Sequence, residues 1–189
     1  MNRKKEIILG IDPGTIVMGY GLIEIVGNKP HLLEMGVLKL SKYKDANIRL
    51  QHIYEKISSI YEAFHPTQFA IEAPFFGKNV QSMLKLGRAQ GVAIASAMQH
   101  GLSATEYSPK KIKQSITGNG NATKEQVWKM LQQILKFEDR PEFLDSTDAV
   151  AVALCHYYQG MGIDKLMKKD NNWESFLKNN AHRIKNNYL

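Results

Sequence analysis

Two acidic side chains each end a short apolar run that is typical of a buried strand. The first run, residues 6–11, ends at Asp12, after which a Pro-Gly pair turns the backbone. The second run, residues 69–71, ends at Glu72. A charge held at the end of a buried strand is unfavourable unless something compensates it, and a divalent cation is the usual compensation. Taken alone, Asp12 could equally cap the turn that follows it.

A second pair of acids, Asp145 and Asp148, stands three residues apart in a stretch with helical periodicity. Side chains at this spacing project from one face of a helix. If that face packs by the strand ends, the pair meets Asp12 and Glu72, and four carboxylates at close range cannot all stay ionised without cations. Two Mg²⁺ ions roughly 3.5–4 Å apart would satisfy them and clamp a phosphodiester in line. In isolation, the pair would be surface acids near a helix start, where the macrodipole favours them.

The elements that must position these acids follow one another in a mixed α/β order. Three strands joined by short turns predict an antiparallel meander, and helices then alternate with two further strands. The expected strands cover residues 6–12, 18–25, 31–40, 69–72 and 104–107, and the expected helices cover residues 46–64, 80–100, 109–116, 123–135 and a last core helix from 141. Gly19 and Gly21 in the second strand allow a close approach or a bulge. The first and fourth strands should lie side by side and parallel, each ending in an acid.

The composition predicts one cytoplasmic domain with a tail. At 189 residues the chain can form a domain over residues 1–158, followed by a basic and helical tail over residues 159–189. The single cysteine, Cys155, excludes an internal disulfide and fits a reducing compartment. No apolar run approaches the roughly 18–20 residues of a membrane helix. The basic start precedes only a short apolar run, so we expect no secretory signal.

The positive charge is concentrated in one part of the chain. The net charge is +7, and the stretch from residue 77 to 124 holds seven cations and one acid, Glu106. The seven cations are Lys78, Lys85, Arg88, Lys110, Lys111, Lys113 and Lys124. Their position beside the candidate acid site favours a groove for a nucleic-acid backbone. The alternative is a solvated basic face.

Two further stretches have patterns with more than one interpretation. In the helix over residues 80–100, Gly87, Gly91 and Ala95 recur every four residues, so one side is nearly flat. Such a face permits close packing against another helix or against the sheet. In the tail, one helical face would carry Trp173, Phe176, Leu177, Ala181 and Ile184. This face could dock on the domain or contact nucleic acid or a partner.

Several of these stretches match a known family in order and spacing. They are Gly10-Ile11-Asp12-Pro13-Gly14, Gly19-Tyr20-Gly21, Ala70-Ile71-Glu72 with Phe75 and Lys78-Asn79, Leu84-Lys85-Leu86-Gly87, Gly91-Val92-Ala93, Tyr107 to Lys113, Gly118 to Val127 and Asp145-x-x-Asp148-Ala149. Over residues 6 to about 158 the chain resembles the RuvC family of Holliday-junction resolvases, which belongs to the RNase H-like nuclease superfamily. It departs from the family at Ala73, where Gln is frequent, and at Ile16, where a basic residue is common. The resemblance implies an α/β fold with an RNase H-like five-stranded mixed sheet flanked by helices.

The resemblance also implies roles for individual residues. Asp12, Glu72, Asp145 and Asp148 would be the catalytic acids that bind two Mg²⁺ ions per subunit, with Mn²⁺ as a substitute. Phe75 matches an aromatic residue that stacks on DNA bases near the crossover, although it could equally be a core residue. Lys113 and Lys124 match lysines near the scissile phosphate. The remaining cations of residues 77–124 would be further DNA contacts.

The implied activity is Mg²⁺-dependent hydrolysis of four-way DNA junctions during homologous recombination and DNA repair. Such a crossover junction endodeoxyribonuclease makes paired symmetric nicks and leaves 5′-phosphate and 3′-hydroxyl ends. A homodimer is expected because one chain has one acid cluster, whereas resolution takes two cuts. The flat face at Gly91 is the candidate interface. A branch-migration motor of the RuvA and RuvB type is the implied partner.

Two other classes of protein share part of these patterns. Asp12-Pro13-Gly14-Thr15 also resembles the start of the phosphate loop of actin-like phosphotransferases, but those folds need a second, similar half that 189 residues do not contain. A non-catalytic junction-binding module would be indicated by the loss of an acid. All four acids are present.

Overall fold

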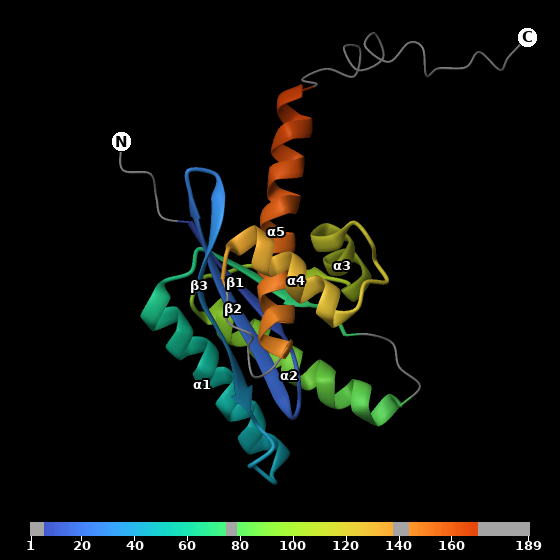
Figure 1. Cartoon of the computed structure of the whole chain (residues 1–189). Coiled ribbons are helices and arrows are strands. Elements are labelled where there is room, and N and C mark those ends of the chain that lie inside the picture. Colours follow the sequence, from blue (N-terminus) through green and yellow to red (C-terminus); the bar gives the residue numbers. More distant parts are fainter. Residues whose placement is uncertain (1–5, 75–78, 138–143, 170–189) are drawn as a thin grey trace, which may run out of the picture. The chain divides into compact units, whose positions relative to one another are not determined.

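The computed structural model describes residues 6–74, 79–137 and 144–169, with side chains described up to residue 161. Ten elements are present in this part of the chain (Figure 1). They are β1 (Glu6–Asp12), β2 (Val17–Val26), β3 (Lys29–Lys39), α1 (Ala46–Phe64), β4 (Gln68–Glu72), α2 (Val80–Gln99), β5 (Ala104–Tyr107), α3 (Pro109–Thr117), α4 (Lys124–Leu135) and α5 (Leu144–Lys169). These elements follow the order and type predicted from the sequence.

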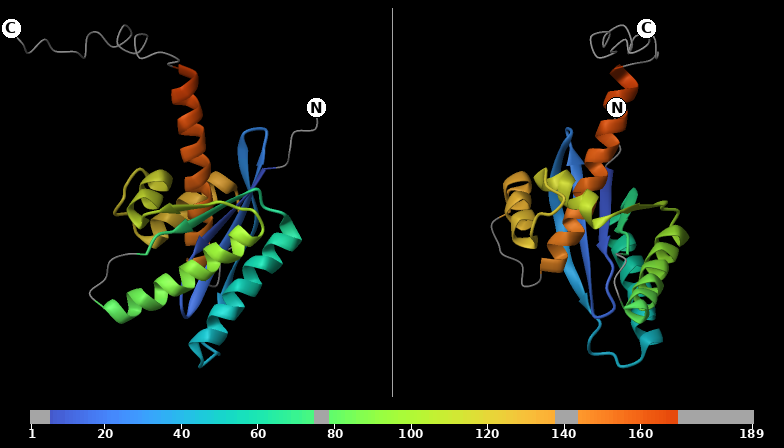
Figure 2. Two further views of the ribbon diagram at one scale, coloured as in Figure 1. Left: turned by 180° about the vertical axis from the view of Figure 1, so that it is seen from behind. Right: turned by 90° about the vertical axis from the view of Figure 1, so that its right-hand side faces the viewer.

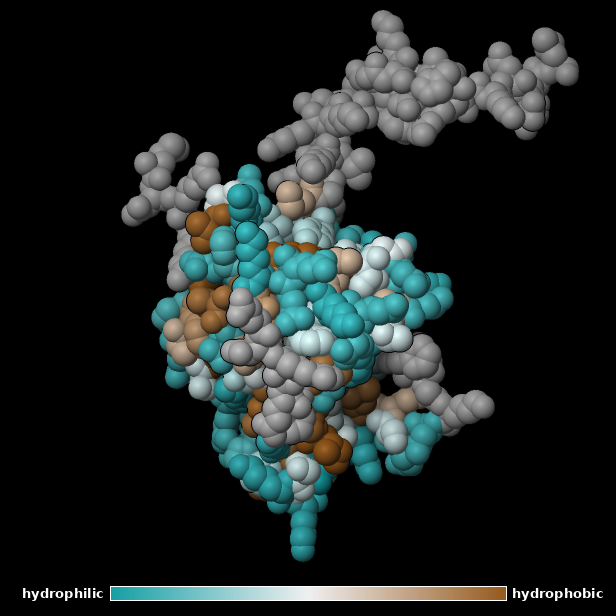
Figure 3. Space-filling model, in the orientation of Figure 1, coloured by the Kyte–Doolittle hydropathy of each residue, from teal (hydrophilic) through white to brown (hydrophobic). Residues whose placement is uncertain are grey.

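The chain divides into two compact units, residues 1–156 and 157–189, and the boundary falls within α5. The expected domain limit at residue 158 and the expected tail helix remain predictions. Residues 170–189, which would carry the apolar tail face, lie outside the described part. None of the helices that the structure describes is long and apolar enough to span a membrane. On the side shown in Figure 3, hydrophilic residues cover most of the described surface, and apolar residues form small patches between them.

The five strands form one mixed sheet in the order β3-β2-β1-β4-β5. Strand β2 runs antiparallel to both β1 and β3, whereas β4 lies between β1 and β5 and is parallel to both. The predicted five-stranded mixed sheet is therefore confirmed. In the register of β1 and β4, Ile11 lies opposite Ile71. The next residue of each strand is an acid, so Asp12 and Glu72 reach the same edge of the sheet.

Helices cover both faces of the sheet. Helices α1 and α2 lie on one face, and α4 with the first part of α5 lies on the other (Figure 2). Alternate residues of β1, Ile7, Leu9 and Ile11, join the buried core of the α1–α2 side. The residues between them, including Gly10 and Asp12, therefore face α5. This alternation directs the acid at the end of β1 toward the helix that carries Asp145 and Asp148.

Three glycines let α5 lie directly on the sheet. A Cβ atom on Gly10 would stand 2.6 Å from the backbone nitrogen of Ala153, and one on Gly21 would stand 2.7 Å from that of Val150. A Cβ on Gly19 would collide with the carbonyl oxygen of Asp145. The predicted close approach at Gly19 and Gly21 is therefore confirmed, and the register shift in β2 lies further on, between Leu22 and Ile23.

Replacing Gly10 by Ala should destabilise the protein by about 1–3 kcal/mol, because the added methyl group would push the backbone of α5 away from β1. The free energy of unfolding in urea measures this effect. Gly160→Ala is the matched control, since this glycine is exposed in α5, no described atom lies within 4 Å of a Cβ there, and Ala favours a helix over Gly. Equal stability changes in the two variants would contradict the packing role of Gly10.

The described residues leave the flat face of α2 uncovered. The residues that α2 buries are on its other side, and they include Ala89, Ala93 and Ala97. Within the described residues, nothing lies within 4 Å of a Cβ built on Gly87 or Gly91. The alternative that this face packs on the sheet is therefore wrong. Along the same side, by helical spacing, lie Val80, Leu84 and Met98, which are 64%, 54% and 61% exposed. These three residues with Gly87, Gly91 and Ala95 form what we call the α2 stripe.

Candidate metal centre

A pocket opens where the carboxyl ends of β1 and β4 meet α3, α4 and α5. It is lined by Asp12, Glu72, Pro109, Ile112, Lys113, Lys124, Val127, Asp148 and Ala151. Three of the four candidate acids and two of the candidate cations thus share one pocket. Its walls come from five elements that are distant in sequence, so the site exists only in the folded chain.

The two strand acids are fixed by the sheet. Asp12 pairs with Gly19 of β2, and Glu72 pairs with Tyr107 of β5. The backbone N–H of Ala73 donates to the carbonyl of Tyr107 at 2.8 Å, so the chain is still held just beyond Glu72. The backbone that carries the two carboxylates is therefore held rigidly at the edge of the sheet.

The two helix acids come from the start of α5. Asp145 is in its first turn, and the hydroxyl of Thr147 donates to the carbonyl oxygen of Leu144 at 2.6 Å. Carboxylate oxygens of Asp12, Asp145 and Asp148 all lie within 4.8 Å of one another. The side chain of Asp148 is only 17% exposed, so the interpretation of a mere surface acid is wrong for it. Glu72 lines the same pocket.

The pKa values of the buried acids show how unfavourable their charges are together. Burial, followed by the charges of Glu72 and Asp148, raises the pKa of Asp12 to about 8. Burial and the charge of Asp148 raise the pKa of Glu72 to about 7. Burial also raises the pKa of Asp148, although the ammonium of Lys124 opposes this shift. Without further positive charge, this cluster cannot be fully ionised at neutral pH.

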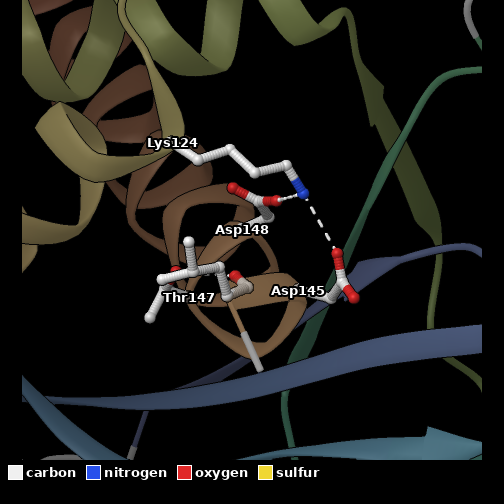
Figure 4. Close-up of polar contacts among 5 residues, drawn as sticks. Lys124, Asp145, Thr147 and Asp148 are labelled. Atoms are coloured by element: carbon white, nitrogen blue, oxygen red, sulfur yellow. Dashed lines mark hydrogen bonds and ion pairs between the residues drawn. The ribbon is translucent and has the colours of Figure 1, made fainter. Parts of the chain in front are cut away.

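One lysine bridges the two helix acids (Figure 4). The ammonium nitrogen of Lys124 lies 3.0 Å from Oδ1 of Asp145 and 2.5 Å from Oδ2 of Asp148. Burial disfavours its charge, but the hydrogen bonds and charges of the two acids outweigh this and raise the pKa of Lys124. Sequence reasoning had assigned Lys124 to DNA and missed this pair, because the partners are 21 and 24 residues away.

The donors of the pocket fit a hard divalent cation. They are carboxylate oxygens, which suit Mg²⁺, Ca²⁺ and Mn²⁺ and not the softer metals that thiolates and imidazoles select. Three of them are close enough to share one ion. Asp12, Asp145 and Asp148 are therefore the residues that would hold such an ion, and Glu72 lines the same pocket.

The other predicted contact residues are distributed over α2 and α3. Lys113 lines the pocket, whereas Lys110 and Lys111 are exposed on α3. Lys85 and Arg88 are exposed on α2. Phe75 and Lys78 lie outside the described residues, so the interpretations of Phe75 as a base-stacking or core residue remain predictions.

Tyr107 and His156 form a contact next to the site that sequence reasoning did not identify. The Tyr107 hydroxyl lies 2.9 Å from Nδ1 of His156 and so links β5 to α5, two turns after Asp148. Burial lowers the pKa of His156 and raises that of Tyr107, which favours a neutral hydrogen bond with the phenol as donor. The only sequence signal was the position of Tyr107 at the end of the strand beside Glu72.

Comparisons with known proteins point to one family. Residues 8–156 match the family model described as RuvC, crossover junction endodeoxyribonuclease RuvC. A Cytophaga hutchinsonii protein of that name is 56% identical over 95% of this chain and 88% of its own length. A Bacteroides fragilis protein of the same name is 52% identical over 96% of this chain and 97% of its own length.

A solved structure gives the same result in three dimensions. The Thermus thermophilus RuvC chain in a complex with a Holliday junction substrate superimposes with a TM-score of 0.76. It is 33% identical in sequence, and the match covers 83% of this chain and 96% of that one. All the residues that line the pocket lie within the region matched by the family model.

Proposed function

Because the chain belongs to the RuvC family of crossover junction endodeoxyribonucleases, we propose that it cuts four-way DNA junctions. The observation that carries this proposal is the pocket itself, where acids from β1, β4 and α5 meet lysines from α3 and α4. Carboxylates that gather divalent ions beside lysines that attract a phosphate are the parts that phosphodiester hydrolysis needs. The solved complex of a related chain with a Holliday junction supports the choice of substrate.

The four acids and Lys113 have different parts in the proposed reaction. Asp12, Glu72, Asp145 and Asp148 hold and orient two Mg²⁺ ions, for which Mn²⁺ can substitute. When bound, these ions supply activation of the attacking water and stabilisation of the leaving 3′ oxygen. Lys113, on the pocket wall, attracts the scissile phosphate and offsets the charge that develops on it. The products carry 5′-phosphate and 3′-hydroxyl ends.

A labelled synthetic four-way junction tests this proposal directly. We expect paired symmetric nicks with Mg²⁺ and none with EDTA, and no cutting of a linear duplex of the same sequence. Cutting that persists in EDTA would exclude the metal mechanism, and equal cutting of the linear duplex would exclude junction selectivity. No cutting of any substrate with Mg²⁺ would favour a junction-binding module.

The proposed enzyme acts as a homodimer in the cytoplasm during recombination and repair, with a branch-migration motor of the RuvA and RuvB type as a partner. Two cuts in strands of like polarity need two acid clusters, and a twofold pair supplies them. The α2 stripe supports this assembly, because it is apolar, nearly flat at Gly87 and Gly91, and open in the single chain. A second copy would bury it.

Gly91→Leu should therefore give a folded monomer with weak junction binding and poorly paired nicks. The position is exposed, and no described atom lies within 4 Å of a Cβ built there, so the larger side chain should not disturb the single chain but would separate two packed copies. Light scattering and circular dichroism measure the two effects together. Gln99→Leu, an exposed residue of the same helix off the α2 stripe, is the control and should remain dimeric. A folded Gly91→Leu dimer would mean that the interface lies elsewhere.

A further inference from the structure

Lys124 places its ammonium between the two acids at the start of α5. Its ammonium contacts Oδ1 of Asp145 at 3.0 Å and Oδ2 of Asp148 at 2.5 Å. Both acids belong to the group that would hold a divalent ion under the proposed function. Charge-assisted pairs of this length are strong and directional. The ammonium of Lys124 therefore offsets the negative charge of these two acids, as a bound metal ion would.

An ammonium and a metal ion compete for these carboxylates. Mg²⁺ binds carboxylate oxygens at about 2.0–2.1 Å and demands near-ideal octahedral geometry. An ion bound to Oδ2 of Asp148 would thus compete for the oxygen that Lys124 contacts, and the two like charges would repel each other. An ammonium held in this position therefore opposes metal binding at Asp148, and its movement away from the acids favours that binding.

The structure gives Lys124 the freedom to leave while its backbone stays fixed. It is the first residue of α4, whose start is held by a reciprocal capping box between Thr123 and Gln126. The side chain is 51% exposed and has four flexible carbons, so the ammonium can turn away from the acids without unfolding the helix. A phosphate that enters the same pocket would offer it a new anionic partner.

We infer that Lys124 is an exchangeable internal counter-ion, which neutralises Asp145 and Asp148 in the metal-free protein and is released toward a junction phosphate when a divalent ion binds. This inference rests on the proposed function for the identity of the metal and of the phosphate. In the protein without DNA, Lys124 thus weakens the binding of a metal ion at the site where it also assists cleavage. Loss of this lysine should slow cleavage and yet tighten the binding of metal.

Calorimetric titration of Mn²⁺ into the full-length protein tests the antagonism. We expect Lys124→Met to lower the Mn²⁺ dissociation constant by roughly tenfold, within the range of typical coupling between sites. Lys124→Arg, which keeps the charge, should bind Mn²⁺ no more tightly than the wild type. Lys113→Met is the matched control, because it removes one positive charge from the same pocket. In the described part of the chain Lys113 makes no ion pair with these acids, so its effect should be clearly smaller.

A second measurement follows the release of the ammonium itself and does not depend on a variant that must fold. In the wild type, acylation of Lys124 by an activated ester, read by peptide mass spectrometry, should be slow in EDTA and several-fold faster with Mg²⁺. Lys129, an exposed lysine of the same helix that does not line the pocket, is the internal reference in the same sample.

The outcomes separate this inference from the proposed function. If Lys124→Met binds Mn²⁺ as the wild type does, or more weakly, while Asp148→Asn loses binding, the counter-ion exchange is wrong and the metal site stands. If Asp148→Asn leaves Mn²⁺ binding unchanged, the metal site of the proposed function fails as well. Unchanged acylation of Lys124 on addition of Mg²⁺ would also overturn the exchange.

Discussion

Asp148→Asn should abolish junction cleavage in Mg²⁺ while junction binding survives or becomes tighter. The side chain is largely buried beside Asp12 and Asp145, and under the proposed function it holds metal and not DNA. Loss of a residue that merely supports a metal ligand costs roughly 10–100-fold in affinity or activity, so loss of a ligand should cost at least that much. Removing a negative charge from the pocket also lowers repulsion toward a phosphate.

The same result is expected for Asp12→Asn, Glu72→Gln and Asp145→Asn, measured as single-turnover cleavage and as junction binding in EDTA. Glu62→Gln, an exposed acid of α1, controls for the change in net charge and should cut normally. Any of the four variants that cuts at a near wild-type rate would remove its residue from the proposed catalytic set. Loss of junction binding together with cutting would mean that the residue supports the fold instead.

The strand acids could be predicted because the sequence marks strand ends directly. An apolar run that stops at an acid and a turn gives both the strand and the position of Asp12, and the second run does the same for Glu72. Spacing also predicted that Asp145 and Asp148 share a helix face. The antiparallel meander of β1 to β3 and the parallel pair of β1 and β4 were predicted, whereas the place of β5 beside β4 was not.

The remaining features of the site depend on contacts between distant segments. No local pattern reveals that the backbone of α5 packs against Gly10 and Gly19. The contact between Lys124 and Asp148 is equally hidden, because both contacts depend on how distant elements pack together. The flat face of α2 was equally ambiguous. A spacing of four residues shows that Gly87 and Gly91 share a side, but only the structure shows that α2 buries the opposite one.

The metal-free protein should lose stability as the pH rises from about 6 to about 9. The folded-state pKa of Asp12 is about 8 and that of Glu72 about 7, against ordinary values of 3.8 and 4.5. A raised acid pKa means that the folded state binds protons more tightly than the unfolded state. These two groups therefore stabilise the fold fully below about pH 4, and the contribution is lost as the pH rises through about 7 to 8.

Thermal melts in EDTA and in Mg²⁺ at pH 6, 7.5 and 9 measure this effect. Each group contributes at most about 1.4 kcal/mol per pH unit between its two pKa values. A stability change of about 1 kcal/mol shifts the melting temperature by roughly 2–4 °C in a protein of this size. In Mg²⁺ the fall should be much smaller, because bound ions favour the ionised acids and the proton is released on binding. Asp12→Asn should flatten the EDTA profile. A wild-type melting temperature in EDTA that rises from pH 6 to pH 9, or an Asp12→Asn profile as steep as the wild type, would show that burial of the acids does not govern the pH dependence of folding.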